Sequence, residues 1–263
     1  MTETLEALGL PEALLPTYLL IAVRFSAAIV VMPVFGARGV PPHTKVGLAL
    51  FLALVMLPLQ EPVALPDGLP ALIAAAVRET LVGVLLGFAV LLVLQGVELA
   101  GSLVGLQMGM GLGEVLDPLT GAGSNEFRRF YGLLAVLIFF LANAHHDVIR
   151  GLFASFEVVP LNQFSAADMN VTALVELSAG VFITATRIAL PVVAAVFLTD
   201  LALALVARTM PQLNVLIVGL PVKVVVGLVV LIAALPATSR VMNLAFNGIL
   251  NDFAALLAPA AQS

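Results

Sequence analysis

The apolar runs of this chain have lengths that fit a regular series of membrane spans poorly. A hydrocarbon core of about 30 Å needs about 20 helical residues. Residues 46–59 would form a helix of only about 21 Å, whereas residues 72–113 and 171–208 would each reach roughly 60 Å. Residues 14–34 and 215–235 have more suitable lengths. Helical hairpins packed within an assembly explain this pattern better than a row of simple spans.

The composition places these runs in or beside a membrane. Of 263 residues, 62% are hydrophobic and 10% are charged, and the mean hydropathy is +1.16. Soluble globular proteins do not have such values. We therefore predict an all-α fold of membrane-associated helical hairpins with long kinked helices. The whole chain, residues 1–263, reads as one all-helical domain with no fused soluble domain.

Charge and residue usage exclude several classes of function. The net charge is −5 and no basic run is present, which argues against nucleic acid as a partner. The chain has no cysteine, so disulfide and thiolate chemistry are excluded. Glu3, Glu6 and Glu12 stand where a secretory signal would be positively charged, so we expect no cleavable signal peptide.

Prolines, glycines and polar residues predict where the long runs are interrupted. Gln95-Gly96 and the glycines after it predict a break in residues 72–113, and Pro191 predicts that residues 171–208 form two packed half-segments. Residues 143–170 read as a polar connector. Residues 241–257 read as a separate amphipathic segment, because asparagines recur every four residues on one face.

Glycines recur every four residues just before a polar, proline-containing loop. On a helix, Gly101, Gly105, Gly109 and Gly113 would form one smooth ridge for close helix packing. Packing is the usual meaning of such a pattern. Here the pattern continues into Met108 and a proline loop, and flexible methionine side chains can seal an irregular gap. The segment is therefore also a candidate for lining or closing a passage.

Several ionisable residues lie inside or at the edges of the apolar runs. A charge at the bilayer centre costs several kcal/mol, so these groups should face protein, water or the interface. For Arg24, Arg208 and Lys223, snorkelling at helix ends is an equal alternative. For the acidic residues, buried pairing is favoured. The interfacial or buried charges are Arg24, Glu79, Glu98, Glu176, Arg187, Asp200, Arg208 and Lys223.

Residues that could carry catalysis or bind a metal are few. His145 and His146 are adjacent, whereas two helical histidines that share one metal stand four residues apart. Ser124 has no convincing base, and no nucleotide-binding glycine loop with a lysine is present. We predict no catalytic residue, no cofactor site and no metal site, and hence no enzyme.

The order and spacing of many residues resemble the FliR family of flagellar export-gate proteins, which is related to the SctT family of injectisomes. The resemblance covers nearly the whole chain, and no single motif is diagnostic by itself. It rests on Arg24, Pro33-Val34-Phe35-Gly36, Pro41, Lys45, Arg78-Glu79, Gly83, Gly87, Gly101, Gln107, Gly109, Asp117-Pro118, Asn143, His145-His146, Pro191, Thr199-Asp200, Arg208, Pro211-Gln212, Asn214 and Pro221-Val222-Lys223.

The resemblance implies a structural subunit of a flagellar type III protein export gate in the bacterial inner membrane, at the flagellar basal body. The implied partners are FliP-like, FliQ-like, FlhB-like and FlhA-like export components, exported flagellar proteins and membrane lipid. A hetero-oligomer of helical hairpins would form the channel, with a plug in the central loop. The matching pore or plug residues are Gln107, Met108, Gly109, Met110, Gly111, Gly113, Asp117 and Pro118.

A small secondary transporter is the alternative reading. In that class, intramembrane carboxylates couple ion movement to solute movement. Glu79, Glu98 and Asp200 are the residues that would take this role.

Overall fold

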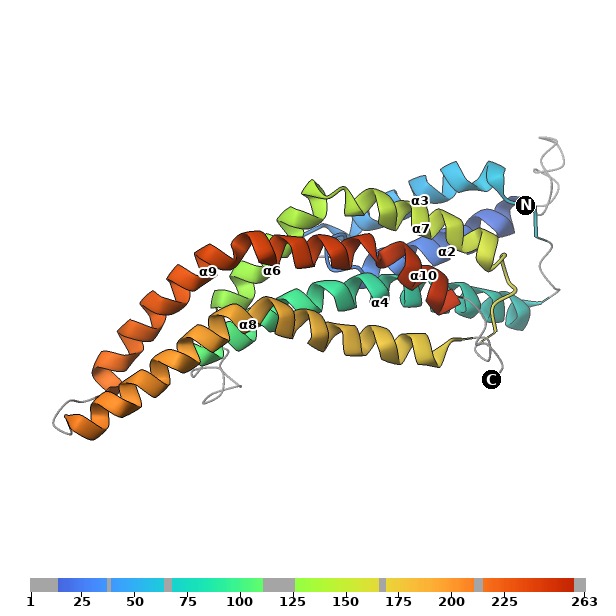
Figure 1. Cartoon of the computed structure of the whole chain (residues 1–263). Helices are drawn as coiled ribbons and strands as arrows, with labels where there is room; N and C mark the ends of the chain where they lie inside the picture. Colours follow the sequence, from blue (N-terminus) through green and yellow to red (C-terminus); the bar gives the residue numbers. More distant parts are fainter. Residues whose placement is uncertain are drawn as a thin grey trace. The chain divides into compact units, whose positions relative to one another are not determined.

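A computed structural model describes residues 14–36, 39–63, 68–110, 126–165, 169–210 and 215–257. Within these ranges every regular element is a helix, and several helices are long and apolar, which confirms the all-α class (Figure 1). The elements are α2 (Leu14–Val31), α3 (Pro42–Met56), the 3-10 turn η1 (Leu57–Leu59), α4 (Leu69–Gln107), α6 (Glu126–Leu141), α7 (Ala144–Val158), α8 (Val171–Thr209), α9 (Val215–Asn247) and α10 (Ile249–Leu257).

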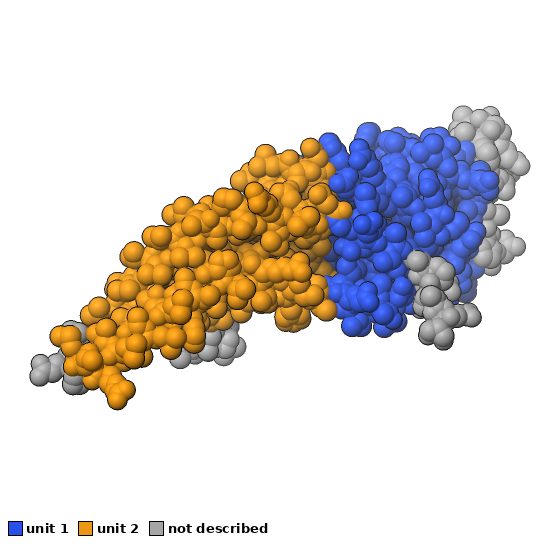
Figure 2. Space-filling model, in the orientation of Figure 1, with its two compact units in different colours: residues 1–91, 145–177, 248–263 blue, residues 92–144, 178–247 orange. Residues whose placement is uncertain are grey.

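The chain divides into two compact units, coloured separately in Figure 2. Unit 1 comprises residues 1–91, 145–177 and 248–263, and unit 2 comprises residues 92–144 and 178–247. Helix α4 contributes residues to both units, as does helix α8. A single domain over the whole chain stays a prediction, and each unit is described separately below.

Unit 1 is built around α2, which packs against α3 and against the first part of α4. The buried ring of Phe25 on α2 lies 5.6 Å from the ring of Phe153 and 5.5 Å from that of Phe156, both on α7. Helix α10 covers another part of α7, where Gly151 allows Phe253 to approach the α7 backbone closely. Aromatic and aliphatic packing therefore forms the core of this unit.

Helices α4 and α2 approach each other closely in unit 1. A Cβ atom at Gly83 would lie 2.8 Å from Cβ of Ala27 and 3.1 Å from the backbone nitrogen of Ala28. One turn later, a Cβ at Gly87 would lie 2.7 Å from the backbone oxygen of Ala28. Two glycines four residues apart thus let the two backbones meet, in the manner of small-residue motifs in membrane helices.

Unit 2 contains the end of α4, α6, most of α8 and α9. Helices α8 and α9 run side by side in Figure 1, and the side chains of Asp200 on α8 and Lys223 on α9 form an ion pair. Helix α6 packs on α9, where the rings of Phe139 and Phe246 meet edge to face with centroids 5.4 Å apart. Both rings are buried.

Several of the predicted interruptions are wrong. Helix α4 continues through Gln95-Gly96, and α8 continues through Pro191 as one helix of 39 residues. Proline removes only one hydrogen bond from a helix, and in apolar surroundings a wider break would leave more backbone groups unpaired. Helix α9 passes Pro236 in the same way and ends at Asn247, so residues 215–235 and 241–247 belong to one helix.

The predicted polar connector is also wrong in its first half, because α7 occupies Ala144–Val158. Its polar residues made the segment read as a loop, but Leu152 and Phe156 are buried on one side of the helix. The helical spacing of the apolar residues therefore determined the structure of this segment more than its polar residues did. In the second half of the predicted connector, the described residues after Val158 are irregular up to the start of α8. Asn170 caps α8, because its Oδ1 accepts a hydrogen bond from the backbone nitrogen of Ala173 at 3.0 Å.

Five helical segments in the described ranges are long and apolar enough to cross a membrane, and α6 and α7 pass the same test only as a pair. The five are Leu14–Val31, Pro42–Leu59, Leu69–Gln107, Val171–Thr209 and Ile217–Leu257. The apolar windows of the last two are only 22% and 17% buried within the chain. Most of their apolar surface must therefore be covered by lipid or by other subunits.

Candidate functional site

The candidate site lies at the end of α4 in unit 2, within the glycine pattern. Helix α4 ends at Gln107 because Gly109 takes a left-handed conformation with φ of +82°. The backbone nitrogen of Gly109 donates to the oxygen of Leu106 at 3.0 Å, and that of Met110 donates to the oxygen of Gly105 at 2.9 Å. This pair of bonds is a Schellman motif, with glycine at the position that follows the C-cap.

The predicted glycine ridge is therefore shorter than expected. Gly101 and Gly105 are buried within α4, but Gly109 lies beyond the helix and serves to end it. Gly113 lies outside the described residues, as do the candidate plug residues Gly111, Asp117 and Pro118. A glycine just after an apolar helical run is a known stop signal, so the sequence did contain the information needed to place this end.

The two methionines on either side of Gly109 have opposite environments. The side chain of Met108 is completely buried, whereas Met110 is 46% exposed. Met108 lies against α9 at Gly227, where an added Cβ would come within 2.5 Å of its terminal methyl carbon. A Cβ at Gly109 would likewise lie 2.7 Å from Cδ1 of Leu220 on α9. Met108 thus fills a gap inside this chain, whereas the side chain of Met110 is open to its surroundings.

Gly101 brings α4 against the start of α6. A Cβ at this position would lie 2.5 Å from the backbone oxygen of Phe127 and 2.8 Å from Cα of Arg128. Beside this contact, Nε of Arg128 donates to Oε2 of Glu98 at 3.3 Å. The Glu98 side chain is 29% exposed, so the ion pair lies at the edge of the helix contact. Such partly solvated pairs contribute little to stability, and close backbone packing dominates here.

A small apolar groove runs beside Gln107 between α4 and α8. Its volume is about 210 Å³. Gln107 and Thr186 are the polar side chains that line it, and the others are Leu103, Leu106, Ala189, Leu190 and Val193.

The buried charge in unit 1 is a cluster around Arg24. Its Nε donates to Oε2 of Glu79 at 2.6 Å, and both side chains are completely buried. Its Nη1 donates to the backbone oxygens of Ser155 and Val159 at 3.1 and 3.0 Å, and Nη2 also donates to Val159 at 3.0 Å. The guanidinium lies 4.1 Å from the ring centroid of Phe156. A buried charge held by so many partners is satisfied within this chain.

The other carboxylate oxygen of Glu79 is also satisfied. Its Oε1 accepts a hydrogen bond from the backbone nitrogen of Asn162 at 2.8 Å. Asn162 has a positive φ of 62°, which asparagine tolerates better than most residues. Arg78 donates from Nη1 to the backbone oxygen of the same asparagine at 2.9 Å. The turn after α7 is therefore tied to α4 at two neighbouring residues.

The remaining predicted charges divide into paired and exposed groups. Asp200 pairs with Lys223, and both are partly buried. Glu176, Arg187 and Arg208 are exposed and have no ion pair within the described part of the chain. Glu176 and Arg187, which share a helix, do not satisfy one another.

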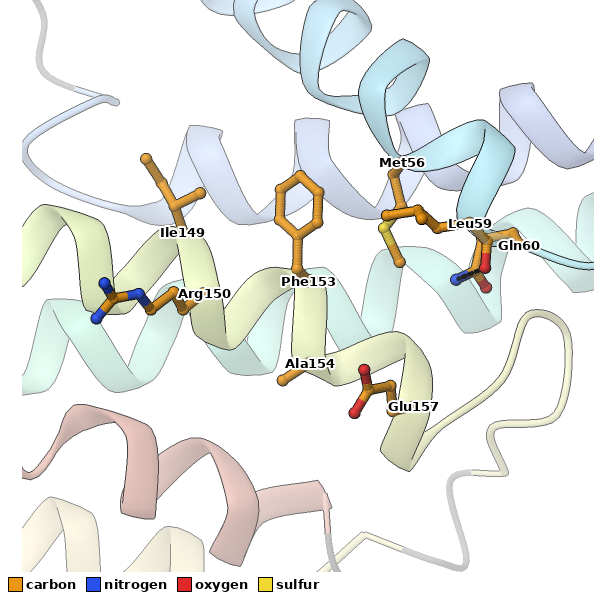
Figure 3. A pocket seen from close by; sticks show the side chains of 8 residues that line it. All are labelled: Met56, Leu59, Gln60, Ile149, Arg150, Phe153, Ala154 and Glu157. Atoms are coloured by element: carbon orange, nitrogen blue, oxygen red, sulfur yellow. Dashed lines mark hydrogen bonds between the residues drawn. The ribbon is translucent and has the colours of Figure 1, made fainter.

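A larger hollow in unit 1 is shown in Figure 3. It has a volume of about 640 Å³ and lies between the end of α3 with η1 on one side and α7 on the other. Met56, Leu59 and Phe153 supply apolar surface, while Arg150 and Glu157 stand along α7. Oδ1 of Asp147 accepts a hydrogen bond from Nη1 of Arg150 at 3.1 Å.

Two comparisons with known proteins bear on the identity of the chain. The family model described as bacterial export proteins, family 1, matches residues 15–249, which is most of the chain. This chain belongs to that family. The match includes the buried cluster in unit 1 and the α4 end in unit 2, so both features lie within the export family's common region.

Curated relatives of this export-family chain carry the name flagellar biosynthetic protein FliR. The one from Bacillus subtilis (strain 168) is 36% identical over 151 residues, which are 57% of this chain and 58% of the relative. The one from Pectobacterium carotovorum subsp. carotovorum is 30% identical over 171 residues, 65% and 66% of the two chains. The one from Escherichia coli (strain K12) is 28% identical over 170 residues, 65% of each chain.

The alignments thus span somewhat less than two thirds of each of these relatives' length. Together with the family match, they confirm the resemblance to the FliR and SctT family that the sequence predicts.

The sequence did not predict several residues that contact the predicted site residues of this export-family chain. Ser155, Val159 and Asn162 hold the Arg24–Glu79 pair, mostly through backbone atoms that any residue carries, so no sequence pattern marks them. Gly227 receives Met108 without belonging to a glycine motif. Arg128 was detectable in principle, as a cation close in sequence to the apolar segment that contains Glu98.

The residues considered for metal and nucleophile chemistry are His145, His146 and Ser124. Within the described ranges no group of three or more histidine, aspartate or glutamate side chains is placed to hold a metal ion. The rings of His145 and His146 lie with centroids 4.1 Å apart and planes tilted by 48° at the start of α7. Ser124 lies outside the described residues.

Proposed function

We propose that this chain is a structural subunit of the flagellar type III export gate in the bacterial inner membrane. With FliP-like and FliQ-like subunits it forms the channel through which unfolded flagellar proteins leave, and it works beside FlhB-like and FlhA-like components. The observation that carries the proposal is the exposed apolar surface of α8 and α9 in a chain of the export family. The apolar 18-residue windows within Val171–Thr209 and Ile217–Leu257 are only 22% and 17% buried inside the chain.

The distribution of charge supports an assembly subunit. Arg24 and Glu79 neutralise each other within unit 1, and Asp200 and Lys223 do so within unit 2. The large exposed side chains of α8 and α9 include Phe182, Phe197 and Ile217, and Glu176, Arg187 and Arg208 are exposed on α8 as well. Such a surface fits the apolar faces of neighbouring helical subunits, and its remainder fits lipid.

The same ion pairs count against the secondary transporter. An ion-coupling carboxylate must exchange its ion during transport, and in this chain Glu79, Glu98 and Asp200 are each paired with a cation of a second helix. Glu79 is in addition completely buried and holds a backbone hydrogen bond. We therefore favour the export gate over the transporter for these three carboxylates.

Co-expression with FliP-like and FliQ-like proteins from the same organism tests the assembly. Native mass spectrometry of the purified membrane fraction is expected to show one stable complex that contains all three proteins. The apolar faces of α8 and α9 would otherwise remain uncovered outside lipid. A lone monomer or homodimer that moves a solute into liposomes would contradict the gate and support the transporter.

Removal of residues 110–117, which are part of the candidate plug, tests the closure of the proposed channel. These residues follow α4 and include the exposed Met110, and the part after Met110 lies outside the described residues. The deletion is expected to leave the mixed complex assembled and to raise its ion conductance in planar bilayers, because a filler of the passage is lost. Conductance equal to that of the undeleted complex would contradict a plug in this segment.

A further inference from the structure

Met108 occupies a position that the proposed channel does not by itself explain. Its side chain is completely buried, although it stands directly before Gly109, the glycine that ends α4. A residue with no exposed surface inside its own chain cannot line a passage. Its role must therefore depend on the contact that buries it.

That contact is with Gly227 in the middle of α9. A Cβ at Gly227 would lie 2.5 Å from Cε, 2.9 Å from Sδ and 3.0 Å from Cγ of Met108. Real Cβ atoms essentially never approach other atoms within 3.0 Å. The outer part of the methionine side chain thus rests on bare backbone, and a side chain at position 227 would force it to shift. Methionine is unbranched, so it can enter such a narrow gap.

The backbone around Met108 fixes the direction of its side chain. Its own nitrogen donates to the oxygen of Val104 at 3.0 Å, and the next two residues close the Schellman motif. Gly109 then lies against Leu220, two turns before Gly227 on the same face of α9. The end of α4 therefore meets α9 at two points, and Met108 is the deeper one.

We propose that Met108 and Gly227 form an intramolecular latch, in which Met108 positions the end of α4, and the exposed Met110 beside it, against α9 when the channel is closed. The inference rests on the proposed function, because the latch acts on the channel that this chain helps to form. Opening of the channel requires Met108 to leave Gly227.

Paired substitutions in the assembled complex test the latch. G227A places a methyl group where Met108 lies, and M108A removes the side chain that needs the space. Each single variant is expected to raise ion conductance about tenfold, the shift expected from one badly fitting core contact. The double variant M108A/G227A is expected to return towards the unmodified complex, because the added methyl no longer meets a methionine. Effects that simply multiply in the double variant would overturn the latch.

Gly180 provides the matched control. It is also a glycine within a helix of unit 2, but a Cβ there would meet nothing within 4 Å. G180A carries the same gain in helix preference as G227A without the contact. It is expected to leave conductance unchanged. A rise as large as that of G227A would assign the effect to helix stiffness and overturn the latch.

A reversible crosslink gives a readout that does not depend on conductance or on packing variants. The chain has no cysteine, so M108C/G227C introduces the only pair. Because a Cβ at position 227 would lie 3.0 Å from Cγ of residue 108, the two Cβ atoms are within about 4.5 Å, which suits a disulfide. Oxidation is expected to join the two cysteines in the assembled complex and to stop export. Reduction is expected to restore export.

The two possible failures can be told apart. Absence of the crosslink in the assembled complex, or full export through crosslinked complexes, would overturn the latch and leave the export role intact. Absence of the mixed complex itself, or export that does not need this chain, would overturn the proposed function. The single variants M108C and G227C show whether either cysteine alone affects export.

Discussion

Arg24→Met is expected to lower the free energy of unfolding by about 3–5 kcal/mol, the usual loss when one partner of a buried ion pair is removed. The substitution leaves the carboxylate of Glu79 completely buried with only the Asn162 nitrogen as donor. It also removes both guanidinium hydrogen bonds from the oxygen of Val159. Thermal and chemical unfolding of the purified complex, followed by circular dichroism, measures the loss.

A double substitution and a neighbouring control make this prediction specific. Arg24→Met with Glu79→Leu removes both charges and is expected to recover most of the lost stability, since apolar pairs of similar volume often replace buried ion pairs. Arg78→Met makes the same change one residue before Glu79, at an exposed side chain, and is expected to cost less than about 1 kcal/mol. Equal losses at Arg24 and Arg78 would contradict a buried, fully bonded cluster.

Gly83→Val is expected to cost at least about 3 kcal/mol, or to prevent accumulation of the protein, because it overpacks the close contact between α4 and α2. The added atoms would meet the backbone oxygen of Arg24 and the backbone nitrogen of Ala28. Backbone atoms cannot rotate away, so α2 must move, and Arg24 would move with it. The amount of protein in the membrane and its unfolding midpoint are the measurements.

Gly47→Val is the matched control for Gly83→Val. Gly47 lies within α3 of the same unit, but a Cβ there would meet nothing within 4 Å. The intrinsic helix preference of valine is the same at both sites, so the difference between the two variants reports the contact with α2 alone. Similar losses in the two variants would show that close approach is not what Gly83 provides.

The class of fold and the family were accessible from the sequence. Long apolar runs can bury their backbone polar groups in a membrane or among helices only if they are helical, so the all-α class follows from composition. The ordered residues from Arg24 to Lys223 indicated the FliR family, which the family model over residues 15–249 confirms. The sequence also indicated that Glu79 needed a cation, because an isolated buried carboxylate is too costly.

Which residues meet, and where helices stop, was decided by the tertiary structure. Arg24 finds Glu79 at a separation of 55 residues and Val159 at a separation of 135, and the latter contact uses a backbone oxygen that no sequence pattern marks. The Gly83–Gly87 pair makes a close contact with α2, while Gly109 of the more regular pattern ends a helix. Pro191 and Pro236 remain inside helices. Local preferences of about 1–3 kcal/mol are smaller than the sum of packing and backbone hydrogen bonding in an apolar environment, so only the assembled contacts determine these positions.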